Sequence, residues 1–184
     1  MAYRIGHTIY FLFIISLSTC SQNKLTTSEQ KTPVFVNSEK EHKAYFASGC
    51  FWCVEAIYES IIGVNNVVSG YSGGNVPNPT YGIVNTKITG HAETIEVSYD
   101  PKIISFSILL DIYFASQEIE QINGQGPDNG PQYRSIIFYQ TVAQRDLINE
   151  KIKSLEKNKN LKVAAEVSAF QKFWIAENYH QDFK

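Results

Sequence analysis

The chain changes character near residue 42, and from there its apolar positions follow two periods. Alternation with period two over 93–99 predicts a half-buried strand, and apolar residues at helical spacing predict a helix that begins at Cys50 and stops at Gly63. Further strands are predicted at 43–47, 67–71, 133–139 and 162–168, further helices at 106–115 and 141–155, and long Gly- and Asn-rich loops at 72–91 and 121–131. This alternation predicts a single α/β (α+β) domain, with a central β-sheet flanked by helices.

The first 41 residues have a different composition. Arg4 and His7 precede an apolar run over 9–17, which is about half of the roughly 20 residues that a membrane-spanning helix needs. A run of this length is typical of a signal peptide. It ends in the segment Leu17–Cys20, LSTC, which resembles a bacterial lipobox except that Thr19 stands where Gly, Ala or Ser is usual.

We therefore expect 1–19 to be a lipoprotein-type signal peptide and Cys20 to carry the lipid. The protein would then be exported to the periplasm or cell envelope and anchored to a membrane. A plain secretory signal with an incidental Cys20 is the alternative. Residues 20–41 are polar and lack apolar periodicity, which predicts a flexible tether and leaves 42–184 as the folded domain.

Composition limits the classes of function. Of the 184 residues, 43% are hydrophobic and 13% aromatic, enough for one domain with a core of its own. The net charge is −2 and no long basic stretch occurs, so nucleic-acid binding has no electrostatic support. The Gly-rich stretches lack phosphate-loop patterns, and we expect no cofactor. A single domain indicates a monomer.

Cys50 and Cys53 form a C-x-x-C pair at the predicted junction of a strand and a helix. A helix N-terminus favours an anion, so Cys50 is a candidate nucleophilic thiolate with Cys53 one helical turn away. The same spacing fits a structural disulfide or a thioredoxin-like disulfide oxidoreductase. Zinc would need two further ligands, and His91 and His180 do not have ligand spacing.

Six segments in chain order separate these possibilities. They are Gly49–Glu55 (GCFWCVE), Gly70–Gly74 (GYSGG), Asn78–Tyr81 (NPTY), Thr89–Glu93 (TGHAE), Asp128 with Gln132–Ser135 (QYRS), and Phe173–Gln181 (FWIAENYHQ). The set resembles the motifs of the A-type peptide methionine sulfoxide reductases over about 42–183. The resemblance implies a ferredoxin-like core rather than a thioredoxin fold. It also implies reduction of methionine-(S)-sulfoxide, free or in proteins, with recycling by a thioredoxin-like thiol reductant.

The same resemblance assigns the chemistry of reduction. Cys50 would attack the sulfoxide sulfur, and its first product would be a sulfenic acid. Glu93, kept protonated by burial, would donate a proton to the sulfoxide oxygen. Tyr81 and Tyr133 would donate hydrogen bonds to that oxygen, where negative charge develops.

Substrate binding would fall to three further residues. Phe51 and Trp52 would form an apolar slot for the S-methyl group. Asp128 would contact the substrate backbone or order the loop that carries Tyr133. All of these residues also have a plainer interpretation as surface carboxylates, core rings or turn residues, and His180 is interpreted as structural; only the ordered set of motifs favours the catalytic interpretation.

The sequence departs from the family pattern at the position of Cys53, where Gly is usual. Many relatives carry a resolving cysteine near the equivalent of Asn85 or in a C-terminal tail, whereas here a single lysine follows Phe183. Cys53 is therefore the only internal candidate to resolve the sulfenic acid. It would form a 50–53 disulfide that the external thiol then reduces.

Overall fold

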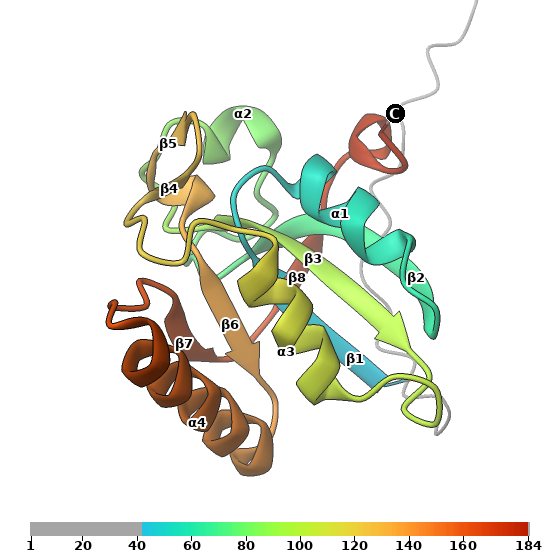
Figure 1. Cartoon of the computed structure of the whole chain (residues 1–184). Coiled ribbons are helices and arrows are strands. Elements are labelled where there is room, and N and C mark those ends of the chain that lie inside the picture. Colours follow the sequence, from blue (N-terminus) through green and yellow to red (C-terminus); the bar gives the residue numbers. More distant parts are fainter. Residues whose placement is uncertain (1–41, 184) are drawn as a thin grey trace, which may run out of the picture. The chain divides into compact units, whose positions relative to one another are not determined.

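The structure, a computed structural model, describes residues 42–183 (Figure 1). In this part of the chain one six-stranded sheet has the order β7-β6-β1-β3-β2-β8. Its strands are β1 (His42–Ala47), β2 (Val64–Ser72), β3 (Ala92–Tyr99), β6 (Ile136–Tyr139), β7 (Glu166–Ala169) and β8 (Phe173–Ile175). Neighbouring strands are antiparallel except for β6 and β7. The inner four, β6-β1-β3-β2, have the strand order of a ferredoxin-like β-α-β-β-α-β core.

Three helices pack on one face of the sheet: α1 (Phe51–Glu59), α3 (Phe106–Ala115) and α4 (Val142–Lys159) (Figure 1). Their apolar sides share one core with the sheet, in which Tyr58, Leu109 and Ile148 are buried. A smaller cluster lies on the opposite face, where the rings of Tyr45 and Phe170 stack 3.8 Å apart. The predicted α/β fold with helices flanking a central sheet is confirmed.

The local sequence explains where two of these helices begin. Ser105 accepts a hydrogen bond from the Ile108 N–H, and Thr141 accepts one from the Gln144 N–H. At the second of these ends the Gln144 side chain also reaches back and accepts from the N–H of Gln140, 2.7 Å away, which is one residue before the N-cap.

Several predicted boundaries are wrong. The strand expected at 162–168 is β7, which starts only at Glu166, and it is not the last, because β8 follows and pairs with β2. A short helix, α2 (Tyr81–Val84), interrupts the first long loop, and Tyr133 lies in the 3-10 turn η1 (Pro131–Tyr133) ahead of β6. Short elements of this kind are stabilised by contacts with distant parts of the chain, which local periodicity does not encode.

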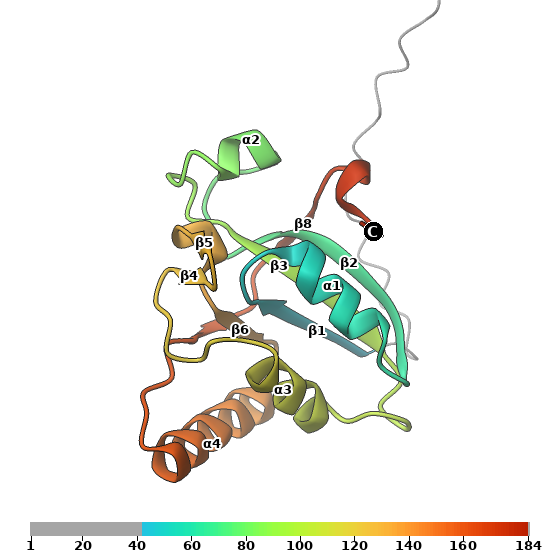
Figure 2. The same ribbon diagram turned by 45° about the horizontal axis from the view of Figure 1, so that its top comes forward.

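The topology places the chemistry at one end of the sheet. Because β1 and β3 are antiparallel, the chain leaving β1 toward Cys50 lies beside the start of β3, where Glu93 sits. The hairpin of β4 (Gly124–Gln125) and β5 (Asp128–Asn129) lies at that end with α2 (Figure 2). Among residues 42–183 no helix has both the length and the apolar character to cross a membrane. The predicted signal peptide, Cys20 and the tether lie outside the described residues.

Gly49 forms the sharp bend between β1 and Cys50. Its φ is +82°, and a Cβ at this position would lie 2.6 Å from the Cβ of Gln125. We expect Gly49→Ala to destabilise the protein by about 1–3 kcal/mol, because both backbone strain and the clash oppose it. Gly82→Ala is the matched control, since nothing lies within 4 Å of a Cβ there. Urea unfolding of both variants checks this, and equal stabilities would contradict it.

Candidate active site

Cys50 lies where strand β1 gives way to helix α1. It is the N-cap of α1, with extended backbone geometry, and its carbonyl accepts from the N–H groups of Cys53 and Val54. The predicted position at a helix N-terminus is therefore present. Cys50 is half-buried and Cys53 is exposed, and both are free thiols in this structure.

The protonation of Cys50 differs from the expectation of a thiolate. The pKa of the Cys50 thiol is raised to about 11, mainly by burial and in part by the charge of the nearby Glu93 carboxylate. The N–H groups of Trp52 and Cys53 lower it, as a helix N-terminus should, but by less. Cys50 is therefore a neutral thiol near pH 7 in the free enzyme, because desolvation outweighs the helix.

Glu93 is a buried carboxyl, with only 2% of its surface exposed. Its Oε2 atom accepts a hydrogen bond from the Phe51 N–H, 3.0 Å away. The pKa of Glu93 is raised to about 7, mainly by burial, while the Phe51 hydrogen bond lowers it and the charge of Asp128 raises it by less. This excludes the interpretation of Glu93 as a solvated surface carboxylate and gives it the mixed protonation that a proton donor needs.

Tyr133 brings the remaining predicted groups into one site. The pKa of Tyr133 is raised to about 12, mainly by burial and in part by the charges of Glu93, Tyr81, Asp128 and Cys50. Such interactions require the groups to lie close together, although they come from α1, α2, β3, β5 and η1. Tyr133 therefore stays protonated at neutral pH and is available as a hydrogen-bond donor in the neighbourhood of the thiol and the carboxyl.

Two aromatic residues follow Cys50 and have different surroundings. Phe51 is almost completely buried, with 1% of its surface exposed, and packs against Tyr71 with ring centroids 5.8 Å apart. Trp52 is only half-buried, and its indole stacks on Phe183 at 3.9 Å. Trp52 can thus present an apolar face to a ligand, with Phe51 beneath as core support.

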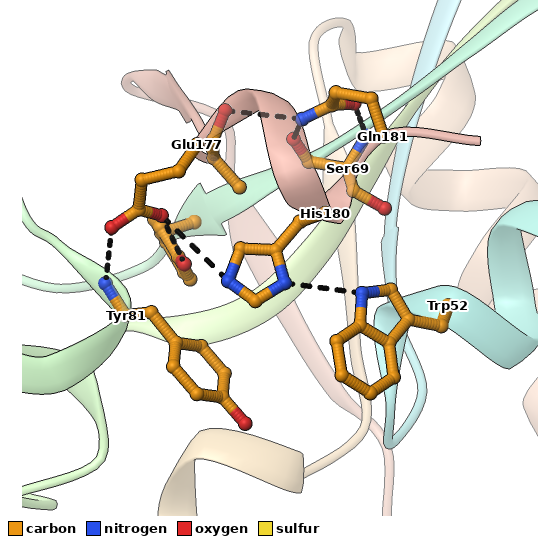
Figure 3. A network of polar contacts seen from close by, with 8 residues as sticks. Trp52, Ser69, Tyr81, Glu177, His180 and Gln181 are labelled. Atoms are coloured by element: carbon orange, nitrogen blue, oxygen red, sulfur yellow. Dashed lines mark hydrogen bonds and ion pairs between the residues drawn. The ribbon is translucent and has the colours of Figure 1, made fainter. Parts of the chain in front are cut away.

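The C-terminal segment closes the site from the side of β2. Glu177 accepts hydrogen bonds from the Tyr81 N–H and the Tyr71 hydroxyl, and His180 accepts one from the Trp52 indole (Figure 3). Sequence reasoning noted this segment as a motif but gave no role to Glu177. The sequence signal that could have indicated such a role is the run of polar and aromatic residues that follows a short apolar segment and is too short to form a helix.

Potential metal ligands among residues 42–183 are engaged by the protein itself. The carboxylates of Glu55, Glu59 and Asp182 lie close together, but the two Glu55 oxygens accept hydrogen bonds from the Ser69 hydroxyl and the Asp182 N–H. His91 is bonded through both ring nitrogens, to Gly74 N–H at 3.2 Å and Val76 carbonyl at 2.8 Å.

A family model described as peptide methionine sulfoxide reductase matches residues 42–184. The chain belongs to this family. It is 47% identical over 140 residues to the peptide methionine sulfoxide reductase MsrA of Saccharolobus solfataricus, a match that covers 76% of this chain and 79% of that protein. The corresponding protein of Pasteurella multocida is 46% identical over 141 residues, covering 77% and 81%.

Solved structures of family members have the same fold. Methionine sulfoxide reductase A of Corynebacterium diphtheriae has a TM-score of 0.72 at 27% identity, covering 80% of this chain and 75% of that one. Reduced Mxr1 from Saccharomyces cerevisiae has a TM-score of 0.73 at 30% identity, covering 78% and 84%. Mxr1 in complex with Trx2 has a TM-score of 0.55 at 21% identity. The predicted family and its sulfoxide reductase activity are confirmed, so the chain is a peptide methionine sulfoxide reductase.

Glu93 makes the stability of this reductase depend on pH. A pKa raised from 4.5 to about 7 means that folding favours the protonated form. The stabilisation is fully present below about pH 4.5 and is lost as pH rises through 7, by about 3 kcal/mol. Glu93→Gln keeps an acceptor for the Phe51 N–H and removes the charge. We expect this variant to gain stability over the wild type between pH 5 and pH 8.

Urea unfolding of the wild type and Glu93→Gln at both pH values measures the difference. Glu150→Gln, at an exposed position on α4, is the control for removing a carboxylate, and its effect should not change with pH. A Glu93→Gln effect that is the same at pH 5 and pH 8 would show that Glu93 does not titrate abnormally.

Proposed function

We propose that Cys50 and Glu93 reduce methionine sulfoxide together, Cys50 as the nucleophile and Glu93 as the acid. The observation that carries this proposal is the buried Glu93 carboxyl, whose pKa of about 7 lies near working pH and which is close enough to interact with the Cys50 thiol. A sulfoxide oxygen is a poor leaving group until it is protonated, so a nucleophile without an adjacent acid would not suffice.

The atoms and electrons of the step balance within the site. The Cys50 sulfur supplies an electron pair to the sulfoxide, and Glu93 donates a proton to the oxygen. That oxygen passes to the Cys50 sulfur as a sulfenic acid, and methionine leaves as the thioether. The proton that leaves the Cys50 thiol returns to Glu93. A neutral Glu93 also no longer opposes ionisation of Cys50 through its charge, so the acid and the thiolate favour each other.

Two sets of groups orient the substrate. Tyr81 and Tyr133 donate hydrogen bonds to the oxygen, and Asp128 borders this side of the site, where its charge favours the protonated form of Glu93. The Trp52 face, supported by Phe51, receives the S-methyl group. A sulfur atom with its oxygen and its methyl group both fixed presents one configuration to Cys50, which supports selection of a single epimer, and the resemblance to the family implies that this is the S epimer.

Cys53 resolves the sulfenic acid. It is the third residue of α1 and is exposed, whereas Cys50 is half-buried. Residues three apart on a helix have Cβ atoms about 5–6 Å apart, and a disulfide needs about 3.5–4.5 Å. A small shift of the first turn therefore brings the sulfurs together, forming the 50–53 disulfide with loss of water.

The reductant for that disulfide is a thioredoxin-like thiol, which exchanges with the exposed Cys53 sulfur. The structure of Mxr1 in complex with Trx2 supports this assignment. The lipobox-like segment ending in Cys20 and the apolar run before it support export and attachment to a membrane through a lipid. The enzyme then works as a tethered monomer, without a cofactor, on oxidised proteins and free methionine sulfoxide.

Single-turnover assays with pre-reduced protein and the two separated epimers of methionine sulfoxide test the proposal. We expect stoichiometric methionine from the S epimer, none with Cys50→Ser, and an unchanged first turnover with Cys53→Ser. Mass spectrometry should show a 50–53 disulfide in the wild type and sulfenylated Cys50 in Cys53→Ser. A wild type that releases no methionine but reduces protein disulfides would point instead to a disulfide oxidoreductase.

A further inference from the structure

The last turn of the chain, Glu177–Gln181, is fixed to the sheet through its own side chains. Gln181 donates from Nε2 to the Ser69 carbonyl at 2.9 Å and accepts from the Ser69 N–H at 3.0 Å (Figure 3). A second bond joins its Nε2 to the Ala176 carbonyl. Because β2 is paired over its length with β3, these bonds tie the turn to the strand that lies beside Glu93.

His180 is buried in this turn, with 1% of its surface exposed, and lies between the Trp52 indole and the Tyr81 ring (Figure 3). The Trp52 Nε1–H donates to His180 Nδ1 at 3.1 Å, and the ring centroids of His180 and Tyr81 are 4.5 Å apart. Nδ1 can accept only if it carries no proton. The neutral ring therefore holds its proton on Nε2, which is 3.9 Å from the Glu177 carboxylate.

Glu177 holds Tyr81, which lies on the opposite side of the His180 ring from Trp52. Its Oε1 accepts from the Tyr81 N–H at 2.9 Å, and its Oε2 accepts from the Tyr71 hydroxyl at 3.0 Å. Tyr81 is the first residue of α2, and the N-cap Thr80 makes no side-chain hydrogen bond to the helix. Glu177 thus satisfies the N–H of the first residue of α2, one of the N–H groups that have no partner within the helix.

We propose that His180 and Glu177 are positioning residues that fix the spacing between the two walls of the substrate site. His180 sets the orientation of Trp52, and so the width of the slot for the S-methyl group. Glu177 sets the position of Tyr81, and so the donor for the oxygen. The proposal rests on the proposed function, since it assumes that Trp52 and Tyr81 contact those two substituents.

The two residues should have separable effects. Loss of the His180 acceptor frees the Trp52 indole to rotate, so a larger S-alkyl group fits and the preference for methyl falls. Loss of Glu177 displaces Tyr81 but leaves the hydrogen bond between Trp52 and His180 in place, so reduction slows for every substrate by the same factor. A residue that only stabilised the fold would change neither the preference nor the rate of the folded enzyme.

The test compares single-turnover reduction of methionine-(S)-sulfoxide with that of its S-ethyl analogue, ethionine-(S)-sulfoxide. The ratio of the methionine sulfoxide rate to the ethionine sulfoxide rate should fall by about 10-fold in His180→Leu. Hydrophobic pockets discriminate between ligands that differ by one methylene by a factor of this order. His180→Asn, which keeps an acceptor near Nδ1, should retain the preference. Glu177→Ala should slow both substrates by about 10- to 100-fold, as a misplaced catalytic group does, with the preference unchanged.

Tyr58→Phe is the matched control for loss of a buried hydrogen bond. The Tyr58 hydroxyl donates to the Leu109 carbonyl at 2.9 Å in the core, away from the groups that contact substrate. Tyr58→Phe should lower the free energy of unfolding without altering the reduction rate of either sulfoxide. If His180→Leu does not fold, His180→Phe, which fills the space with a ring and lacks the acceptor, takes its place beside His180→Asn.

Three outcomes separate a failure of the proposed function from a failure of the positioning roles. A wild type that reduces neither sulfoxide means that the proposed function itself fails. An active wild type with the same methyl preference in His180→Leu or His180→Phe overturns the role of His180. An unchanged rate in Glu177→Ala overturns the role of Glu177.

Discussion

Burial of the Glu93 carboxyl is the constraint around which the site is built. An ionised carboxylate at this position would be shielded from water, and its hydrogen-bond partner within residues 42–183 is the Phe51 N–H. The fold therefore favours the protonated acid, and its pKa reaches the range of neutral pH. The same burial keeps Cys50 a neutral thiol in the free enzyme. Because the charge of Glu93 also raises the pKa of Cys50, protonation of one group favours ionisation of the other.

The ferredoxin-like core makes this burial possible because it brings the end of β1 beside the start of β3. Neither strand closes the site alone. The loops that carry Tyr81 and Tyr133 close one side, and the strand β8 and the turn after it close the other (Figure 1). Arg134 links the two loops by donating to the carbonyls of Gly90 and Pro131 and by pairing with Glu166 on β7. The chemistry is therefore held by contacts between segments far apart in sequence.

Much of this arrangement follows from the sequence, and the failures have identifiable causes. The alternation over 93–99 and the helical spacing after Cys50 gave strands and helices whose cores lie where expected, since burial on one face leaves a clear period. α2 and β8 were missed because they are four and three residues long and are held by Glu177 and by pairing with β2. The raised pKa of the Cys50 thiol was not foreseen, because spacing reveals the helix N-terminus but not the depth of burial. His180 could not be given a role before its contact with Trp52 was known.

The most direct test of this account is the titration of Glu93 itself. Carbon-13 NMR of the side-chain carboxyls in Glu-labelled, pre-reduced protein follows it, and the signal absent from Glu93→Gln identifies it. The account predicts a midpoint near pH 7, well above the roughly 4.3 of a solvated glutamate. A Glu93 signal that titrates near pH 4 would mean that the carboxyl is ionised at working pH, and the proton for the sulfoxide oxygen would have to come from elsewhere.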